Sequence, residues 1–127
     1  MEHPIFFRIS LALSVTPILF GINGMLRPNA HLRALNFPAH TEPQAKKLNH
    51  ALMRIWGIRN LSVGFLLTLI WTTGDERLMG KALCAGLALP ITDGFVSRRL
   101  IGGGELQHWM FPPVILVVMA GLFGWFD

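Results

Sequence analysis

The sequence predicts an all-α integral membrane protein, a four-helix bundle whose helices are joined by short connectors. Of its 127 residues, 52% are hydrophobic and only 14% are charged, and the mean hydropathy is +0.49. A small soluble domain has roughly a quarter of its residues charged. Four stretches are long and apolar enough to approach the roughly 20 residues that a helix needs to cross a bilayer. Composition and hydropathy therefore both favour a protein that folds within a membrane.

The four expected spans and their connectors make residues 1–127 a single transmembrane domain. The spans are about residues 5–26, 50–72, 78–96 and 107–126. No cluster of positive charge precedes the first apolar stretch, and no small-residue cleavage site follows it. We therefore expect a retained span there rather than a signal peptide.

The connectors differ in length and character. Residues 27–49 contain three prolines and several charges, which predicts a loop with one short interfacial helix near residues 41–47, where Pro43 suits a helix start. Residues 73–77 form a tight connection that contains Gly74. Residues 98–105 include three consecutive glycines, which predict a flexible hinge.

Basic residues predict the orientation in the membrane. With four spans, the first and third connectors share one face, and the termini share the other face with the second connector. The first face carries Arg27, Arg33, Lys46, Lys47, Arg98 and Arg99, and the second carries Arg8, Arg77 and Lys81. The excess places the first face in the cytoplasm and both termini outside or in the lumen, in the endoplasmic reticulum if the cell is eukaryotic. Because the basic residues form no dense run, we expect no nucleic-acid partner.

Small residues recur where helices should touch. They are Gly57 and Gly64 in the second span, Gly80, Cys84 and Ala88 in the third, and Ala120 and Gly124 in the fourth. Small side chains let helix backbones approach closely in lipid. They favour packing within the bundle, and the same feature is compatible with a homodimer.

Polar residues gather at one depth of the predicted bundle. They are Asn23, His50, Arg54, Arg59, Asn60, Thr92, Asp93, Gln107, His108 and Trp109. Since alternate spans run in opposite directions, all of these fall in the cytoplasmic third. An ionisable residue inside a span costs roughly 2.5–3.5 kcal/mol, so it normally faces the interior and has a partner.

Asp93 is the first candidate for a catalytic group because it is the one acidic residue within a span. Arg59 and Arg54 are candidates to orient it and to stabilise oxyanion charge. His50 and His108, as a facing pair, would relay protons. Each assignment has a structural alternative. An Asp–Arg pair can simply fix helix register, Arg54 can extend to the interface, and histidine is common at a water boundary. Whether Asp93 acts as acid, base or nucleophile stays open.

Further polar and aromatic residues are candidates for substrate binding. They are Asn23, Asn60, Trp56, Trp109 and Gln107. We expect no cofactor and no metal. A single cysteine, Cys84, allows no disulfide or cysteine-rich zinc site. Glu105 and His108 make one Glu-x-x-His step, whereas di-metal bundles use two with further carboxylates.

The run 54–60, Arg-Ile-Trp-Gly-Ile-Arg-Asn, together with Gly64, Asp93 and His108-Trp109, resembles the signature of a family of small four-span proteins classed as a domain of unknown function. The resemblance covers about residues 5–126. Members are common in fungi and bacteria and occur in fungal natural-product gene clusters, which implies an intramembrane enzyme for lipophilic intermediates. Membrane terpene cyclases differ, because they are longer and pair two acidic residues within the bundle.

The leading hypothesis is an enzyme that uses acid–base chemistry to cyclise, isomerise or open an epoxide in a lipophilic polyketide or terpenoid. Its partners would be that small molecule and membrane lipid. A second hypothesis is a small proton-coupled transporter with Asp93 as the coupling acid. Small multidrug exporters, however, carry their membrane carboxylate in the first span, which has none here. A third hypothesis is a non-catalytic membrane assembly subunit.

Overall fold

The fold was analysed in a computed structural model that describes residues 4–38 and 40–127. Every regular element in these residues is helical, which confirms the all-α prediction for the described part of the chain. The helices are α1 (Pro4–Leu26), α2 (Pro28–Ala34), α3 (Pro43–Thr72), α4 (Glu76–Gly86), α5 (Ala88–Ile101), α6 (Leu106–Trp109) and α7 (Phe111–Leu122).

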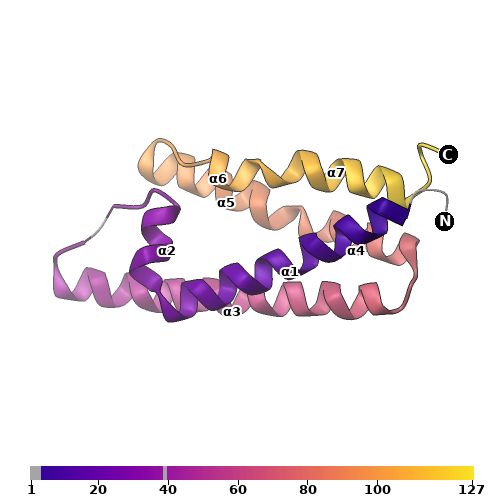
Figure 1. Ribbon diagram of the computed structural model, residues 1–127. Coiled ribbons are helices and arrows are strands. Elements are labelled where there is room, and N and C mark those ends of the chain that lie inside the picture. Colours follow the sequence, from indigo (N-terminus) through magenta and orange to yellow (C-terminus); the bar gives the residue numbers. More distant parts are fainter. Residues whose placement is uncertain (1–3, 39) are drawn as a thin grey trace.

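The helices form two layers that lie close together near the start of α1 and diverge toward α2 (Figure 1). One layer is the closely packed pair α1 and α3, and the other contains α5, α6 and α7, with α4 completing the bundle. The start of α1 and the C-terminus lie near the turn between α3 and α4, whereas α2 and the turn between α5 and α6 lie at the opposite end. The first and third connectors therefore share one end of the molecule.

The buried core lies toward the end that holds the termini. Its centre is Met79 and Leu83 of α4 packed against Val118 and Leu122 of α7, all at most 4% exposed. Phe6 and Phe7 of α1 cover this cluster from the other layer. This apolar core joins α4 and α7 to α1 at one end of the molecule. Toward the α2 end, space remains between the layers.

The first connector is more helical than the sequence predicts. The expected short helix near residues 41–47 and the second span are one helix, α3, of 30 residues. The Glu42 carboxylate caps it by accepting hydrogen bonds from the backbone amides of Gln44 (3.0 Å) and Ala45 (2.6 Å). Helix α2 was not expected at all, although Pro28 occupies its first turn, where proline is favoured.

The third predicted span, 78–96, corresponds to α4 and α5, which together run from Glu76 to Ile101. Pro90 has no amide hydrogen for the carbonyl four residues earlier, which explains the break between the two helices at Leu87. At its far end α5 terminates at Gly102, whose φ of 68° is the left-handed conformation that glycine adopts readily.

Three helical stretches are long and apolar enough to cross a membrane: α1, α3 and Glu76–Ile101. The fourth apolar stretch, Leu106–Leu122, is shorter, because the chain turns before α6 and breaks again between α6 and α7. By length, the structure thus supports three of the four predicted spans. Large apolar side chains such as Leu19, Phe65 and Leu116 are more than half exposed on the outside, as expected for helices that face lipid.

Glycines bring α1 and α3 into backbone contact. A Cβ atom on Gly57 would lie 2.7 Å from the carbonyl oxygen of Gly21, and one on Gly64 would lie 2.6 Å from that of Ser14. The predicted packing role of Gly57 and Gly64 is therefore confirmed. Gly80 packs instead against the ring of Phe123, 2.9 Å from where its Cβ atom would lie.

The other small residues predicted to pack between helices do not all do so. Ala120 is buried, and Gly124 adopts a left-handed turn with φ 77°. Cys84 and Ala88 remain exposed, so they do not pack within the described part of the chain.

Candidate functional site

A cavity of about 280 Å³ lies between the two layers. Most of its wall is apolar, from side chains of α1, α3, α4, α5 and α7, and α2 closes part of it with Ala34 and Leu35. Seven polar or amphipathic side chains interrupt this wall: Thr16, His31, Trp56, Asn60, Asp93, Gln107 and His108. An apolar cavity with a few convergent polar groups is typical of small-molecule sites.

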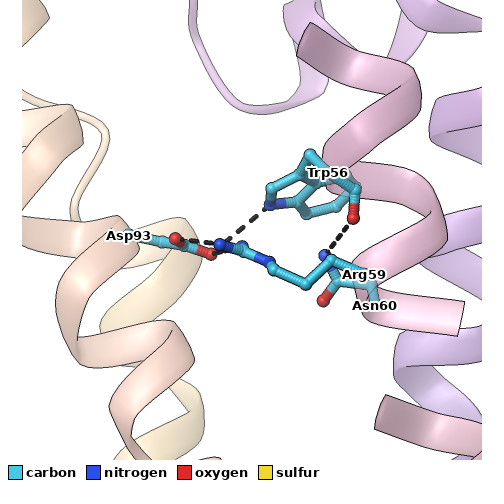
Figure 2. Close-up of polar contacts among 4 residues, drawn as sticks. All are labelled: Trp56, Arg59, Asn60 and Asp93. Carbon is cyan, nitrogen blue, oxygen red and sulfur yellow. Dashed lines mark hydrogen bonds and ion pairs between the residues drawn. The ribbon is translucent and has the colours of Figure 1, made fainter. Parts of the chain in front are cut away.

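Asp93 and Arg59 form an ion pair between α5 and α3 (Figure 2). Arg59 Nη2 donates to both carboxylate oxygens of Asp93, at 2.9 and 3.1 Å. Trp56 Nε1 donates to the same carboxylate at 3.4 Å. The Asp93 side chain is 18% exposed, against 39% for Arg59, so the carboxylate is the more enclosed partner. The sequence expectation that the lone acid of the spans meets an arginine is thus met by Arg59.

His31 of α2 lines the cavity and carries a buried ring nitrogen, Nε2, without a partner within the described residues. Its ring is 5% exposed and packs against Trp56 with ring centroids 4.7 Å apart. Asn23 Nδ2 donates to His31 Nδ1 at 2.7 Å. Because Nδ1 accepts this bond, the ring proton of neutral His31 lies on Nε2. Nε2 is buried and has no partner within the described residues.

Burial lowers the pKa of His31 below its ordinary value, and the nearby His108 lowers it further. Neutral His31 is therefore the stable form at pH 7. It can donate a hydrogen bond without bringing a charge into the apolar cavity.

His108 lies on the same cavity and is 7% exposed. Its Nε2 is also buried without a partner within the described part of the chain. The residue lies in α6, the single turn that follows Gly104, where the positive φ of 77° reverses the chain. His31, His108 and Asp93 thus line one cavity.

Asn60 and Gln107, two predicted substrate-binding residues, also line the cavity. The amide nitrogen of Asn60 donates to the backbone oxygen of Trp56 at 2.9 Å (Figure 2). Its oxygen remains available to a ligand, whereas its nitrogen is engaged with its own helix.

Four other predicted site residues lie elsewhere. Asn23 does not line the cavity, and it hydrogen-bonds to His31, which does. Trp109 packs on Gly94 and donates to the backbone oxygen of Ile91 at 3.3 Å. Arg54 is exposed and outside this cavity.

His50 bonds Asn29 at 2.6 Å and lines a second cavity, about 230 Å³ in volume. The expected facing pair of His50 and His108 is therefore replaced by His31 and His108. The reason is that α2, which was not expected, brings His31 over the polar end of the bundle.

Residues 14–122 match the sequence profile of the family described as Domain of unknown function (DUF4267). The chain belongs to this family. No curated protein and no solved structure matches the chain. The resemblance to a family of unknown function is thus confirmed, while the membership of natural-product gene clusters stays a prediction.

His31 is the residue of this DUF4267 chain that sequence reasoning missed. It lies in a connector expected to be a loop, so it was not counted among the polar residues of the spans. Pro28, at the start of a helix that follows α1 directly, was the available signal. Within the described residues, no three His, Cys, Asp or Glu side chains are placed to hold a metal ion.

Proposed function

We propose that this DUF4267 protein is a small integral membrane enzyme that isomerises a lipophilic hydroxy-epoxide by acid–base chemistry. The observation that carries the proposal is that Asp93 and His31 line one apolar cavity, and that His31 Nε2 is a buried donor without a partner within the described residues. The substrate class follows from this cavity. Its wall accepts a hydrocarbon skeleton, and its few polar groups act on one oxygen-bearing end.

Asp93 is the proton acceptor in this proposal. As a carboxylate held by Arg59 and Trp56, it is fixed in position and ready to take a proton from a substrate hydroxyl. The hydroxyl oxygen forms a bond to an epoxide carbon, and the epoxide C–O bond breaks. The released oxygen takes the proton back from Asp93, so the product is a cyclic isomer of the substrate.

His31 stabilises the developing oxyanion. Its Nε2–H is already directed by the bond from Asn23, so it needs little reorganisation to meet negative charge. His108 binds the substrate hydroxyl from the same cavity. Arg59 and Trp56 keep Asp93 oriented, while Asn60 and Gln107 contact the oxygenated end of the substrate.

The proposed setting is a four-span bundle in the membrane, the endoplasmic reticulum in a eukaryotic cell. Three helices of sufficient length support it, as do the exposed apolar side chains on α1, α3, α5 and α7. Leu106–Leu122 would cross as a fourth, short span. A lipophilic polyketide or terpenoid intermediate would then enter the cavity from the bilayer, and no soluble carrier is needed.

The test is conversion by purified membranes that contain wild-type protein or the Asp93→Asn variant. Each is incubated with a panel of lipophilic hydroxy-epoxides and polyenes, and isomers are separated by chromatography before mass spectrometry. We expect Asp93→Asn to lower turnover by about 10²–10⁴-fold, the usual contribution of general acid–base catalysis. Asp75→Asn is the matched control, because Asp75 caps α4 at the opposite end of the bundle.

A folded Asp93→Asn protein with full turnover would overturn the proposal. A second candidate, a non-catalytic assembly subunit, is favoured by the ion pair itself, since Arg59 and Asp93 join α3 to α5 whether or not chemistry occurs. It would be supported if combined Asp93→Asn and Arg59→Gln left cellular function unchanged. Substrate-dependent proton flux in liposomes without conversion would instead indicate a transporter.

A further inference from the structure

A second cavity lies outside the candidate active site, between α2 and the first turns of α3. It has a volume of about 230 Å³. Its lining residues are Asn29, Leu32, Arg33, Phe37, Pro38, His40, Lys46, Asn49 and His50. None of these belongs to the wall of the first cavity, so the two sites are separate.

The lining of this second cavity is basic. Arg33 and Lys46 supply two permanent positive charges, and the side-chain amides of Asn29 and Asn49 add uncharged donors. Among the residues that the structure describes, no acidic side chain lines the cavity. The closest acid in sequence, Glu42, interacts electrostatically with His40, but its carboxylate is held by the amides of Gln44 and Ala45. The cavity therefore favours an anion.

One hydrogen bond already organises the cavity wall. His50 Nε2 and Asn29 Oδ1 are 2.6 Å apart, which ties the start of α2 to α3. Since the oxygen of Asn29 accepts, the ring nitrogen of His50 donates, and the amide nitrogen of Asn29 stays free for another acceptor. The two basic side chains thus flank a preformed set of donors.

The position along α3 matches a lipid headgroup. A helix of 30 residues is about 45 Å long, whereas the hydrocarbon core is about 30 Å thick. The first turns of α3 therefore extend beyond the core, and Lys46 lies one turn before the predicted start of the span at residue 50. Leu26 and Leu48, 77% and 59% exposed, lie at the same end of the helix pair α1–α3. They can contact acyl chains next to the basic cavity.

We propose that this second cavity binds the phosphate of an anionic phospholipid. Arg33 and Lys46 pair with the phosphate oxygens, Asn29 and Asn49 donate to the headgroup, and the exposed leucines contact the acyl chains. Basic pockets beside membrane helices bind anionic headgroups in this manner. A free phosphate ion shares the headgroup chemistry but would gain nothing from the apolar surface.

The test is lipid binding to the full chain in detergent, measured by native mass spectrometry. Phosphatidylglycerol and phosphatidylcholine are titrated into wild-type protein and into a variant with Arg33→Gln and Lys46→Gln. We expect phosphatidylglycerol to bind wild type more tightly than phosphatidylcholine does, and to bind the variant about 10- to 30-fold more weakly. The matched control is Lys47→Gln with Arg98→Gln, which removes the same charge from exposed positions outside the cavity.

Three results would overturn the proposal. One is an equal loss in the control variant, which would indicate general surface charge. Another is equal affinity of the wild-type protein for phosphatidylglycerol and phosphatidylcholine. This comparison uses only the wild-type protein, so it does not depend on the folding of a variant. The third is competition by inorganic phosphate at the same concentration as phosphatidylglycerol, which would indicate a free-anion site. Weak competition, only at much higher phosphate concentration, supports the lipid.

Discussion

At the scale of single residues, the informative contact is the hydrogen bond from Asn23 to His31. It fixes the ring proton on Nε2, the buried nitrogen that has no partner within the described residues, and it makes Asn23 a positioning residue rather than a ligand of the substrate. The pair also explains why a histidine is tolerated at 5% exposure: one nitrogen is satisfied, and neutral imidazole carries no charge to bury.

His31 predicts a dependence of stability on pH. Burial holds its folded-state pKa below 6.5, so between the two pKa values the unfolded chain binds more protons than the folded chain. The stabilising contribution of neutral His31 is therefore complete above about pH 6.5 and is lost as the pH falls below that value. We expect the thermal unfolding temperature in detergent to fall from pH 7 to pH 5, and to fall less in the His31→Asn variant.

His40→Asn is the control for this measurement, because His40 is exposed in the connector before α3. It should retain the wild-type pH profile. Identical profiles for wild type and His31→Asn would show that the protonation of His31 does not contribute to stability.

Sequence reasoning succeeded for Asp93 and Arg59 because a lone acid in an apolar span needs a cation, and few cations were within reach. It failed for His31, because the sequence did not predict α2, and only the packing of α2 shows that this side chain is buried. It also misplaced His50. The sequence predicted the depth of His50 in the bundle, but not its hydrogen-bond partner on another helix, which is Asn29.

At the scale of elements, the contact between α1 and α3 depends on the absence of side chains. A Cβ atom on Gly57 would lie 2.7 Å from the Gly21 carbonyl oxygen and 2.6 Å from Met25 Cγ. Met25 can move, whereas the backbone of α1 cannot move without separating the helices. We expect Gly57→Ala to lower the free energy of unfolding by about 1–3 kcal/mol, as for other overpacked sites.

Chemical unfolding in detergent micelles checks this prediction, with Gly86→Ala as the matched control. A Cβ atom on Gly86 would meet nothing within 4 Å, so that variant should be neutral or slightly more stable. Wild-type stability in Gly57→Ala would contradict the close approach of α1 and α3.

The helix boundaries include features that hydrophobic patterns in the sequence did not predict. Residues 43–49 continue α3 because Glu42 caps its N-terminus, whereas the sequence predicted a separate short helix near residues 41–47. Helix α2 has seven residues, about two turns, which is too short for a hydrophobic period to be recognised. In contrast, α1 and the main part of α3 were predicted within a few residues, since long apolar stretches fix a helix by composition alone.

At the scale of the whole molecule, the two ends of the bundle differ in charge and in content. One end contains α2 and the turn between α5 and α6, together with the polar groups of both cavities. The first and third connectors, which lie at this end, carry six basic residues, whereas the end with the termini holds three. Positive charge is retained on the cytoplasmic side of membranes. This asymmetry predicts that the α2 end is cytoplasmic and that the anionic headgroup proposed above belongs to the cytoplasmic leaflet.

Labelling of single cysteines tests this orientation and the number of crossings together. In a Cys84→Ser background, a membrane-impermeant maleimide is applied to intact cells that carry Lys47→Cys, Thr73→Cys, Gly103→Cys or Asp127→Cys. Gly103 suits this purpose because a Cβ atom there meets nothing within 4 Å and its φ is not positive, unlike that of its neighbours Gly102 and Gly104.

We expect labelling of Thr73→Cys and Asp127→Cys from outside, and labelling of Lys47→Cys and Gly103→Cys only after permeabilisation. If Asp127→Cys instead behaved like Gly103→Cys, Leu106–Leu122 would not cross the membrane. The chain would then have three spans, the number that helix length alone supports, and its termini would lie on opposite sides.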